Sequence, residues 1–272
     1  MRGIRLLVLL ITVVGVSSCS KFRKIQKSGD WRVQYEAALK YYEDKDYHRA
    51  EILLDQIRPI IRGTAEAELA EFTLAYCYYY QKQYILSAHH FDEFVRIYGR
   101  SEYVMEASYL HAHSLYLQSP DYQLDQTVTY EAIAAMQNFI NRYPSSQYAS
   151  EGDQIIDLMQ QKLEKKAYEK CQLFYNLRKL RGYKAPLVVY DNFKDDYPDS
   201  KYQEEVAYLK IVTYYDYARE SIRSKQEERF QSTIDSYLAF LDKYPNSEYL
   251  KDAEKLYVES VEEITKFADS KN

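Results

Sequence analysis

The chain has 272 residues with a net charge of −5 at pH 7, and its acidic and basic side chains are mixed throughout. Nucleic-acid-binding proteins usually show a basic stripe, so no nucleic-acid partner is expected. The mean hydropathy of −0.56 excludes a bilayer-spanning segment beyond the N-terminus. Seven glycines and six prolines are few, which favours long helices joined by short turns.

The first eighteen residues have the three parts of a secretion signal. Arg2 and Arg5 supply positive charge, and the apolar run from Leu6 to Val16 is shorter than the ~20 residues that span a bilayer. Two serines then precede Cys19, which resembles the bacterial lipobox. This resemblance implies cleavage before Cys19 and a covalent lipid on its sulfur, with no other cofactor. The alternative is an ordinary signal peptide that contains a cysteine.

Residues 19–30 are then expected to form a lipidated tether with four cations, at Lys21, Arg23, Lys24 and Lys27. Cations here can contact anionic lipid head groups; a solvated linker is the alternative. Ser20 follows the cysteine and no acidic cluster comes next. By resemblance to known lipoprotein sorting, this favours the periplasmic face of the outer membrane over the inner membrane or the cell surface.

One pattern, Phe-x-x-x-Tyr-Pro-x-Ser-x-Tyr, organises the rest of the chain. Copies begin at Phe139, Phe193 and Phe240, and a fourth at Phe94 carries Gly99 in place of proline. Proline ends the helix that precedes it. The serine can cap the next helix by accepting from a backbone N–H, which is expected of three serines: Ser146, Ser200 and Ser247.

Helical periodicity between the copies predicts stacked helix pairs. The expected helices begin near residues 31, 48, 64, 84, 101, 127, 147, 186, 201, 227 and 248, with Thr64 as a cap and a glycine break at 181–183. The predicted fold is an all-α, tetratricopeptide-like solenoid of about five pairs with a C-terminal capping helix. The predicted parts are a signal peptide (1–18), the tether (19–30), repeats one to three (31–145), repeats four and five with the cap (146–268) and a tail (269–272).

The lipobox cysteine, short basic tether and five repeats with the Tyr-Pro-x-Ser motif resemble the BamD family, across residues 19–267. BamD proteins are lipoprotein subunits of the outer-membrane β-barrel assembly machine. The resemblance implies a scaffold that binds the barrel-inserting subunit and unfolded barrel precursors. It also implies that the N-terminal repeats bind substrate and the C-terminal repeats dock.

Catalytic motifs are absent from the sequence: there is no Gly-rich phosphate loop, His-Glu-x-x-His or Gly-x-Ser-x-Gly. His111 and His113 point about 200° apart on a helix and cannot share a metal. We therefore expect no enzyme activity, no metal and no small-molecule substrate. Cys77 and Cys171 are expected to be buried thiols rather than a disulfide.

Aromatic stripes on the first helices of repeats one to three are the candidate peptide-binding groove. Its residues are Tyr35, Tyr42, Phe72, Tyr76, Tyr79, Tyr109 and Tyr116. Tyrosine gives a large contact area at small entropic cost. The alternative is that these rings pack between helices, because tyrosine also fills the core of this chain.

Two other functions compete with this interpretation. One is a periplasmic tetratricopeptide lipoprotein that coordinates cell-envelope synthesis or division. The other is a glycan-binding lipoprotein on the cell surface, which the single tryptophan, Trp31, disfavours.

Overall fold

The computed structural model describes residues 21–269, and these residues are helical without any strand. The all-α prediction is therefore confirmed. The predicted signal peptide, Cys19 and the last three residues lie outside the described residues. Within residues 21–269, no helix is both long and apolar enough to cross a bilayer.

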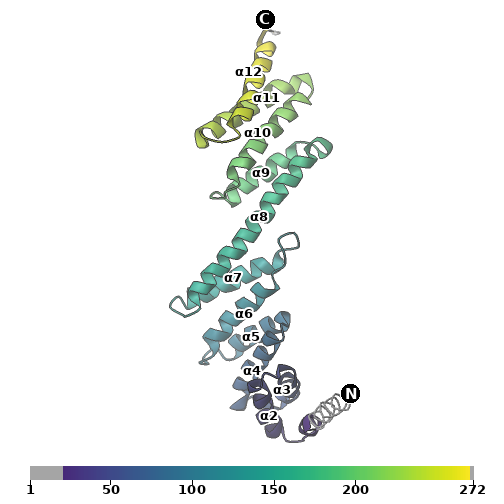
Figure 1. Cartoon of the computed structure of the whole chain (residues 1–272), viewed down its shortest axis with the longest axis vertical. Helices are drawn as coiled ribbons and strands as arrows, with labels where there is room; N and C mark the ends of the chain where they lie inside the picture. Colours follow the sequence, from purple (N-terminus) through teal and green to yellow (C-terminus); the bar gives the residue numbers. More distant parts are fainter. Residues whose placement is uncertain (1–20, 270–272) are drawn as a thin grey trace, which may run out of the picture. The chain divides into compact units, whose positions relative to one another are not determined.

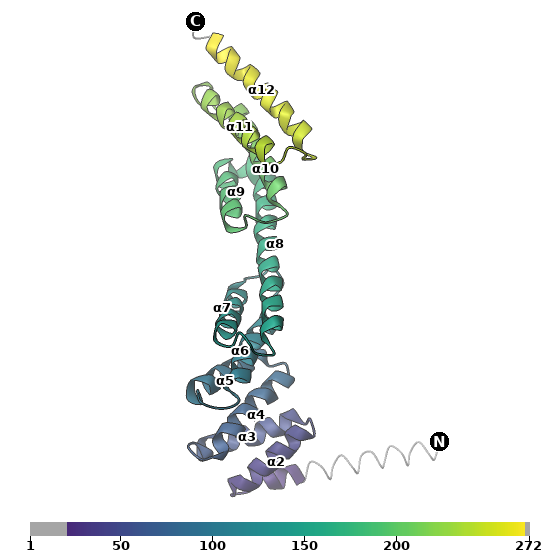
Figure 2. The same ribbon diagram turned by 90° about the vertical axis from the view of Figure 1, so that its left-hand side faces the viewer.

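The helices follow one another in pairs (Figure 1). They are α2 (Trp31–Glu43), α3 (Tyr47–Ile61), α4 (Glu66–Tyr80), α5 (Tyr84–Ile97), α6 (Val104–Gln118), α7 (Thr127–Arg142), α8 (Ala149–Arg181), α9 (Lys184–Asp196), α10 (Gln203–Arg219), α11 (Arg223–Lys243) and α12 (Leu250–Asp269). Consecutive helices from α2 to α7 lie side by side, as do those from α9 to α12 (Figure 2).

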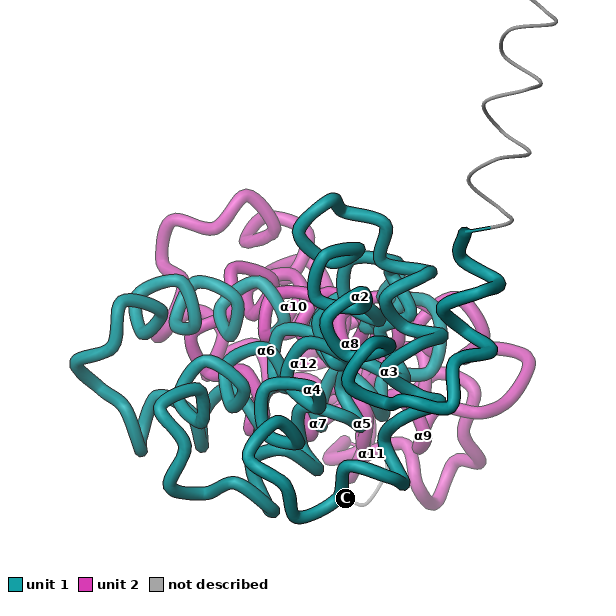
Figure 3. Tube along the Cα trace, turned by 90° about the horizontal axis from the view of Figure 1, so that it is seen from below, with its two compact units in different colours: residues 1–159 teal, residues 160–272 magenta. Residues whose placement is uncertain are grey.

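The chain divides into two compact units between Met159 and Gln160, inside the uninterrupted helix α8 (Figure 3). Unit 1 is built around Phe72, Phe91, Met136 and their neighbours, together with a second cluster between α2, α3 and α4. Unit 2 contains clusters around Tyr190 and Phe240.

The repeated motif ends its helices as the sequence predicts. The last helical residue stands directly before the motif tyrosine in each copy, at residues 97, 142, 196 and 243. The phenylalanine is buried in every copy, at 1–2% exposure. Gly99 leaves this geometry intact, because the Tyr98 N–H still donates to the Phe94 carbonyl at 2.8 Å.

The predicted serine caps are wrong as helix caps: α10 begins at Gln203 after Tyr202, which makes no side-chain cap. Two of the three serines instead make a local hydrogen bond in the turn before the helix. Ser200 and Ser247 accept from the backbone N–H two residues later, both at 3.1 Å, and Ser101 does the same in the glycine copy at 3.0 Å. Ser146 is the exception, since its hydroxyl is buried without a hydrogen-bond partner. The predicted cap at Thr64 is also wrong: α4 begins at Glu66 after Ala65, which makes no side-chain cap.

The last tyrosine of the motif joins successive repeats. In each copy its ring stacks on an aromatic ring of the preceding first helix: Phe72–Tyr103, Tyr109–Tyr148, Tyr168–Tyr202 and Tyr208–Tyr249, with centroids 3.9–4.8 Å apart. These pairs explain why the motif extends to its tenth position.

Residues 21–26 form a short helix on the first repeat. Phe22 lies edge-on to Tyr41, with centroids 5.7 Å apart. The buried amide of Gln34 donates to the carbonyls of Gln26 and Ser28 at 2.9 and 3.1 Å. Part of the predicted tether is thus packed against the repeats.

Other local predictions hold. Gly182 ends α8 with a φ of +96°, and its N–H donates to the Arg178 carbonyl at 2.9 Å. Only glycine adopts this region without strain. Cys77 and Cys171 are free and buried, and burial raises the pKa of both thiols, to about 12.

Candidate functional site

Six of the seven predicted groove residues form a continuous series of ring contacts across α2, α4 and α6. Tyr42 lies 6.3 Å from Tyr76, measured between centroids, and Tyr76 contacts Phe72 and Tyr79 at 5.1 and 6.4 Å. His113 then links the rings of α4 to those of α6. Its ring lies 5.9 Å from Tyr79, 5.5 Å from Tyr109 and 5.6 Å from Tyr116.

The seventh residue, Tyr35, packs against the cluster between α2, α3 and α4. Burial and the nearby Glu66 raise the pKa of its hydroxyl. Tyr42 packs against the same core, so Tyr35 and the start of the series share one cluster.

Three further tyrosines extend the series. Tyr80 stacks between Tyr47 and Tyr76, at 4.6 and 5.5 Å, and Tyr148 stacks on Tyr109 at 4.3 Å. A signal was present in the sequence, because Tyr80 ends a run of three tyrosines and Tyr148 closes a motif copy. We call the combined set the aromatic row: Tyr42, Tyr47, Phe72, Tyr76, Tyr79, Tyr80, Tyr109, His113, Tyr116 and Tyr148.

The aromatic row has a buried part and an accessible part. Phe72 and Tyr109 are only 7% and 5% exposed and belong to the core. Tyr42, Tyr76 and Tyr79 are half-buried, whereas Tyr80 is 47% exposed. The row therefore joins the repeats and also leaves phenol rings where another molecule can reach them.

Burial shapes the chemistry of the row. It is the main cause that raises the pKa of the Tyr42, Tyr76 and Tyr109 hydroxyls, and it lowers the pKa of His113. At neutral pH these phenols are uncharged hydrogen-bond donors and the imidazole is neutral. The hydroxyl of Tyr79 and Nδ1 of His113 lie 3.0 Å apart.

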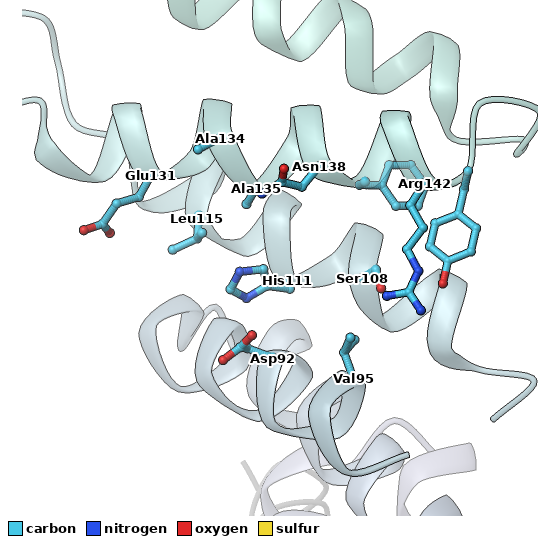
Figure 4. Close-up of a pocket in the computed structure, with 12 residues that line it drawn as sticks. Asp92, Val95, Ser108, His111, Leu115, Glu131, Ala134, Ala135, Asn138 and Arg142 are labelled. Atoms are coloured by element: carbon cyan, nitrogen blue, oxygen red, sulfur yellow. The ribbon is translucent and has the colours of Figure 1, made fainter. Parts of the chain in front are cut away.

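A groove of about 540 Å³ lies on the other side of α6 (Figure 4). Its floor is Ser108, His111 and Leu115, which lie roughly 130° around the helix from the aromatic row at 100° per residue. The imidazole of His111 points into the groove (Figure 4), with Nδ1 2.9 Å from the Ala88 carbonyl oxygen.

Helices α5 and α7 form the walls of this groove. Two small residues of α7, Ala134 and Ala135, leave room above the floor, and Val95 of α5 adds apolar surface. Arg142 lies at one end, 5.4 Å above the Tyr143 ring, and Glu131 lies at the other. The groove suits an apolar side chain with polar groups at its ends.

A half-buried ionic network bridges α3, α4 and α5 elsewhere in unit 1. Arg58 pairs with Glu71 at 2.7 Å and with Glu93 at 2.5 Å. His90 stacks on Tyr78 at 4.9 Å, and its Nδ1 is buried without a partner. Burial, aided by the positive Arg58, lowers the pKa of His90 to about 4.

Within residues 21–269, no three His, Cys, Asp or Glu side chains gather as a metal site would require. Both features of unit 1, the aromatic row and the groove, instead offer contact area and hydrogen bonds, which are the means of non-covalent recognition.

Comparisons with a family model and with two relatives agree on outer-membrane proteins of one kind. Residues 29–181 and 166–265 match the family model YfiO, described as an outer membrane lipoprotein. Over 88 residues, 32% of this chain, it is 31% identical to the outer membrane protein assembly factor BamD of Caulobacter vibrioides. Over 68 residues, 25% of the chain, it is 29% identical to the protein of the same name from Helicobacter pylori. The matched segments span 29% and 31% of those two relatives.

Proposed function

The chain belongs to the YfiO family of outer membrane lipoproteins, and from this premise we propose that it is a scaffold of outer-membrane protein assembly. In this role it binds the barrel-inserting subunit of the Bam complex and unfolded barrel precursors, and it catalyses no reaction. The observation that carries the proposal is the family match, which covers repeats in both units. The names of the two relatives support the assembly role.

Anchoring follows from the same proposal. A lipid on Cys19 holds the protein at the periplasmic face of the outer membrane, since two or more acyl chains anchor stably where one is marginal. A Cys19→Ser variant tests this step. It should appear in the soluble fraction of broken cells, whereas the unaltered chain should sediment with outer membranes and incorporate labelled palmitate.

The aromatic row is the proposed site for an extended precursor segment. Its exposed and half-buried phenols offer apolar contact together with hydroxyl groups, and such surfaces suit unfolded segments of varied sequence. The C-terminal repeats of unit 2 are then available for docking on the assembly machine.

Co-purification from native membranes tests the function. The full-length chain, isolated with mild detergent and analysed by mass spectrometry, should recover the barrel-inserting subunit. Recovery of peptidoglycan synthases without that subunit would instead favour the role in envelope synthesis or division. Release of the protein by protease treatment of intact cells would favour the surface glycan-binding role.

A further inference from the structure

The charged groups that act on the aromatic row carry one sign. Glu106, in the first turn of α6, accepts a hydrogen bond from the Tyr76 hydroxyl and another, at 3.4 Å, from Tyr148. Glu151, in the first turn of α8, stands beside Tyr109. Burial and then these carboxylates raise the pKa of the Tyr76 and Tyr109 hydroxyls.

The influence of these two carboxylates extends along the row. Glu106 also raises the pKa of Tyr42 and Tyr80, after the larger effect of burial. Glu151 acts in the same direction on Tyr79 and favours the charged form of His113, against the effect of burial. The row therefore combines electron-rich ring faces with a negative field.

Another face of α4 has a balanced charge. There Tyr78 donates to Asp55 at 2.8 Å, but the nearby Arg58 opposes the effect of that carboxylate on its pKa. Arg58 likewise opposes the acidic groups around Tyr98. The negative field is thus a property of the aromatic row and not of every tyrosine in unit 1.

From this juxtaposition we infer that the aromatic row selects partner segments in which lysine or arginine stands next to aromatic or long apolar side chains. The inference rests on the proposed function, which makes the row a binding site for extended segments. A cation is attracted by tyrosine ring faces and by nearby carboxylates, whereas an acidic segment is repelled. Glu106 and Glu151 are the residues that determine this specificity.

Both carboxylates are placed to act on a bound segment. Glu151 is exposed and Glu106 is half-exposed, next to the 47% exposed ring of Tyr80. The two phenol hydrogen bonds hold the Glu106 carboxylate in one position, so little entropy is lost when a cation binds it.

The test uses the full-length chain in detergent micelles and three fluorescein-labelled nonapeptides. Each peptide alternates phenylalanine with lysine, glutamine or glutamate, and binding is measured by fluorescence anisotropy. The lysine peptide should bind best and the glutamate peptide worst. Exposed ion pairs contribute modestly, so the Glu106→Gln/Glu151→Gln double variant should weaken the lysine peptide by about fivefold. The glutamine peptide should bind this variant unchanged.

Two controls separate the possible failures. Glutamine at position 106 can still accept from the phenols, which preserves the row, and Glu131→Gln removes an exposed carboxylate from the groove and should change nothing. Tyr80→Ala should weaken every peptide. If Tyr80→Ala acts but lysine and glutamine peptides bind alike, the charge selection is refuted while the binding role stands. If no peptide binds, or Tyr80→Ala has no effect, the aromatic row is not the binding site. The binding role of the row and its charge selection then both fail, whereas the scaffold role is tested separately by co-purification.

Discussion

The stacked tyrosines between repeats allow a quantitative test of how this array holds together. In unit 2, Tyr208 of α10 and Tyr249, directly before α12, stack with centroids 4.8 Å apart and planes 15° from parallel. Both rings also pack on the cluster around Phe240. Replacing either tyrosine by leucine keeps an apolar side chain but removes the ring pair.

The expected change in the free energy of unfolding has two contributions, lost contact area and the lost ring pair. Each single substitution should destabilise the protein by about 1–2 kcal/mol through lost contact area. An aromatic pair contributes about 0.5–1.5 kcal/mol beyond burial. The double variant should therefore be less destabilised than the sum of the single variants by that amount, as a double-mutant cycle measures.

Urea unfolding followed by far-UV circular dichroism provides the free energies for the four proteins of the cycle. A matched cycle combines Tyr208→Leu with Tyr130→Leu, an exposed residue of unit 1, and should be additive within ~0.3 kcal/mol. A coupling that small for Tyr208 and Tyr249 would show that the stacking contributes nothing specific. The role of the tenth motif position would then need another explanation.

Three further predictions concern polar side chains. Because the pKa of His90 falls from 6.5 to about 4 on folding, the unfolded chain takes up a proton first as the pH drops. The free energy of unfolding should then decline by about 3 kcal/mol between pH 6.5 and 4. The His90→Phe variant should flatten this decline in urea titrations at several pH values. An unchanged pH slope in the variant would contradict the role of His90. Ser247→Ala removes the hydroxyl that accepts from the Tyr249 N–H and should cost about 1 kcal/mol in thermal unfolding. Ser146→Ala removes a hydroxyl without a partner and should cost nothing, so equal losses would disprove the difference between these two serines. Gln34→Leu should lower the free energy of unfolding by about 1–3 kcal/mol, because it leaves backbone carbonyls unpaired. It should also speed amide hydrogen exchange in the helix at residues 21–26. Unchanged exchange there would show that Gln34 does not hold this helix.

Local signals in the sequence account for the helices and their ends. The aromatic-proline pairs at residues 143–144, 197–198 and 244–245 mark where the helices stop, because proline acts on the backbone of its own neighbourhood whatever lies around it. The left-handed glycine at position 182 is equally local. These features could be predicted without any knowledge of packing.

Features that depend on two distant segments could not be predicted in this way. The stacked pairs join residues far apart in sequence, such as Tyr109 and Tyr148. The buried amide of Gln203 donates to the Tyr197 carbonyl at 2.6 Å, although glutamine usually indicates an exposed position. The unpaired hydroxyl of Ser146 has the same motif context as Ser247 and differs only in its surroundings.

The candidate site was partly predictable. Periodicity placed the aromatic residues in stripes on the correct helices, but burial decides their roles, and Phe72 is core where Tyr80 is accessible. The groove beside α6 depends on the small pair Ala134 and Ala135. Adjacent alanines are common in helices, so only the packing of α5 and α7 shows that this pair opens a groove.

The packed start of the chain determines how the proposed anchor would hold the protein. Residues 21–26 are fixed on the first repeat through Gln34 and Gln56, whose amides reach the Gln26 carbonyl at 2.9 and 3.0 Å. Cys19 precedes Lys21 by two residues, a reach of at most ~7 Å. In an acylated chain, no long flexible linker would separate the lipid from the first repeat. The height of repeat one above the lipid would be set by covalent geometry, and a client bound there would be kept within a short step of the membrane it must enter.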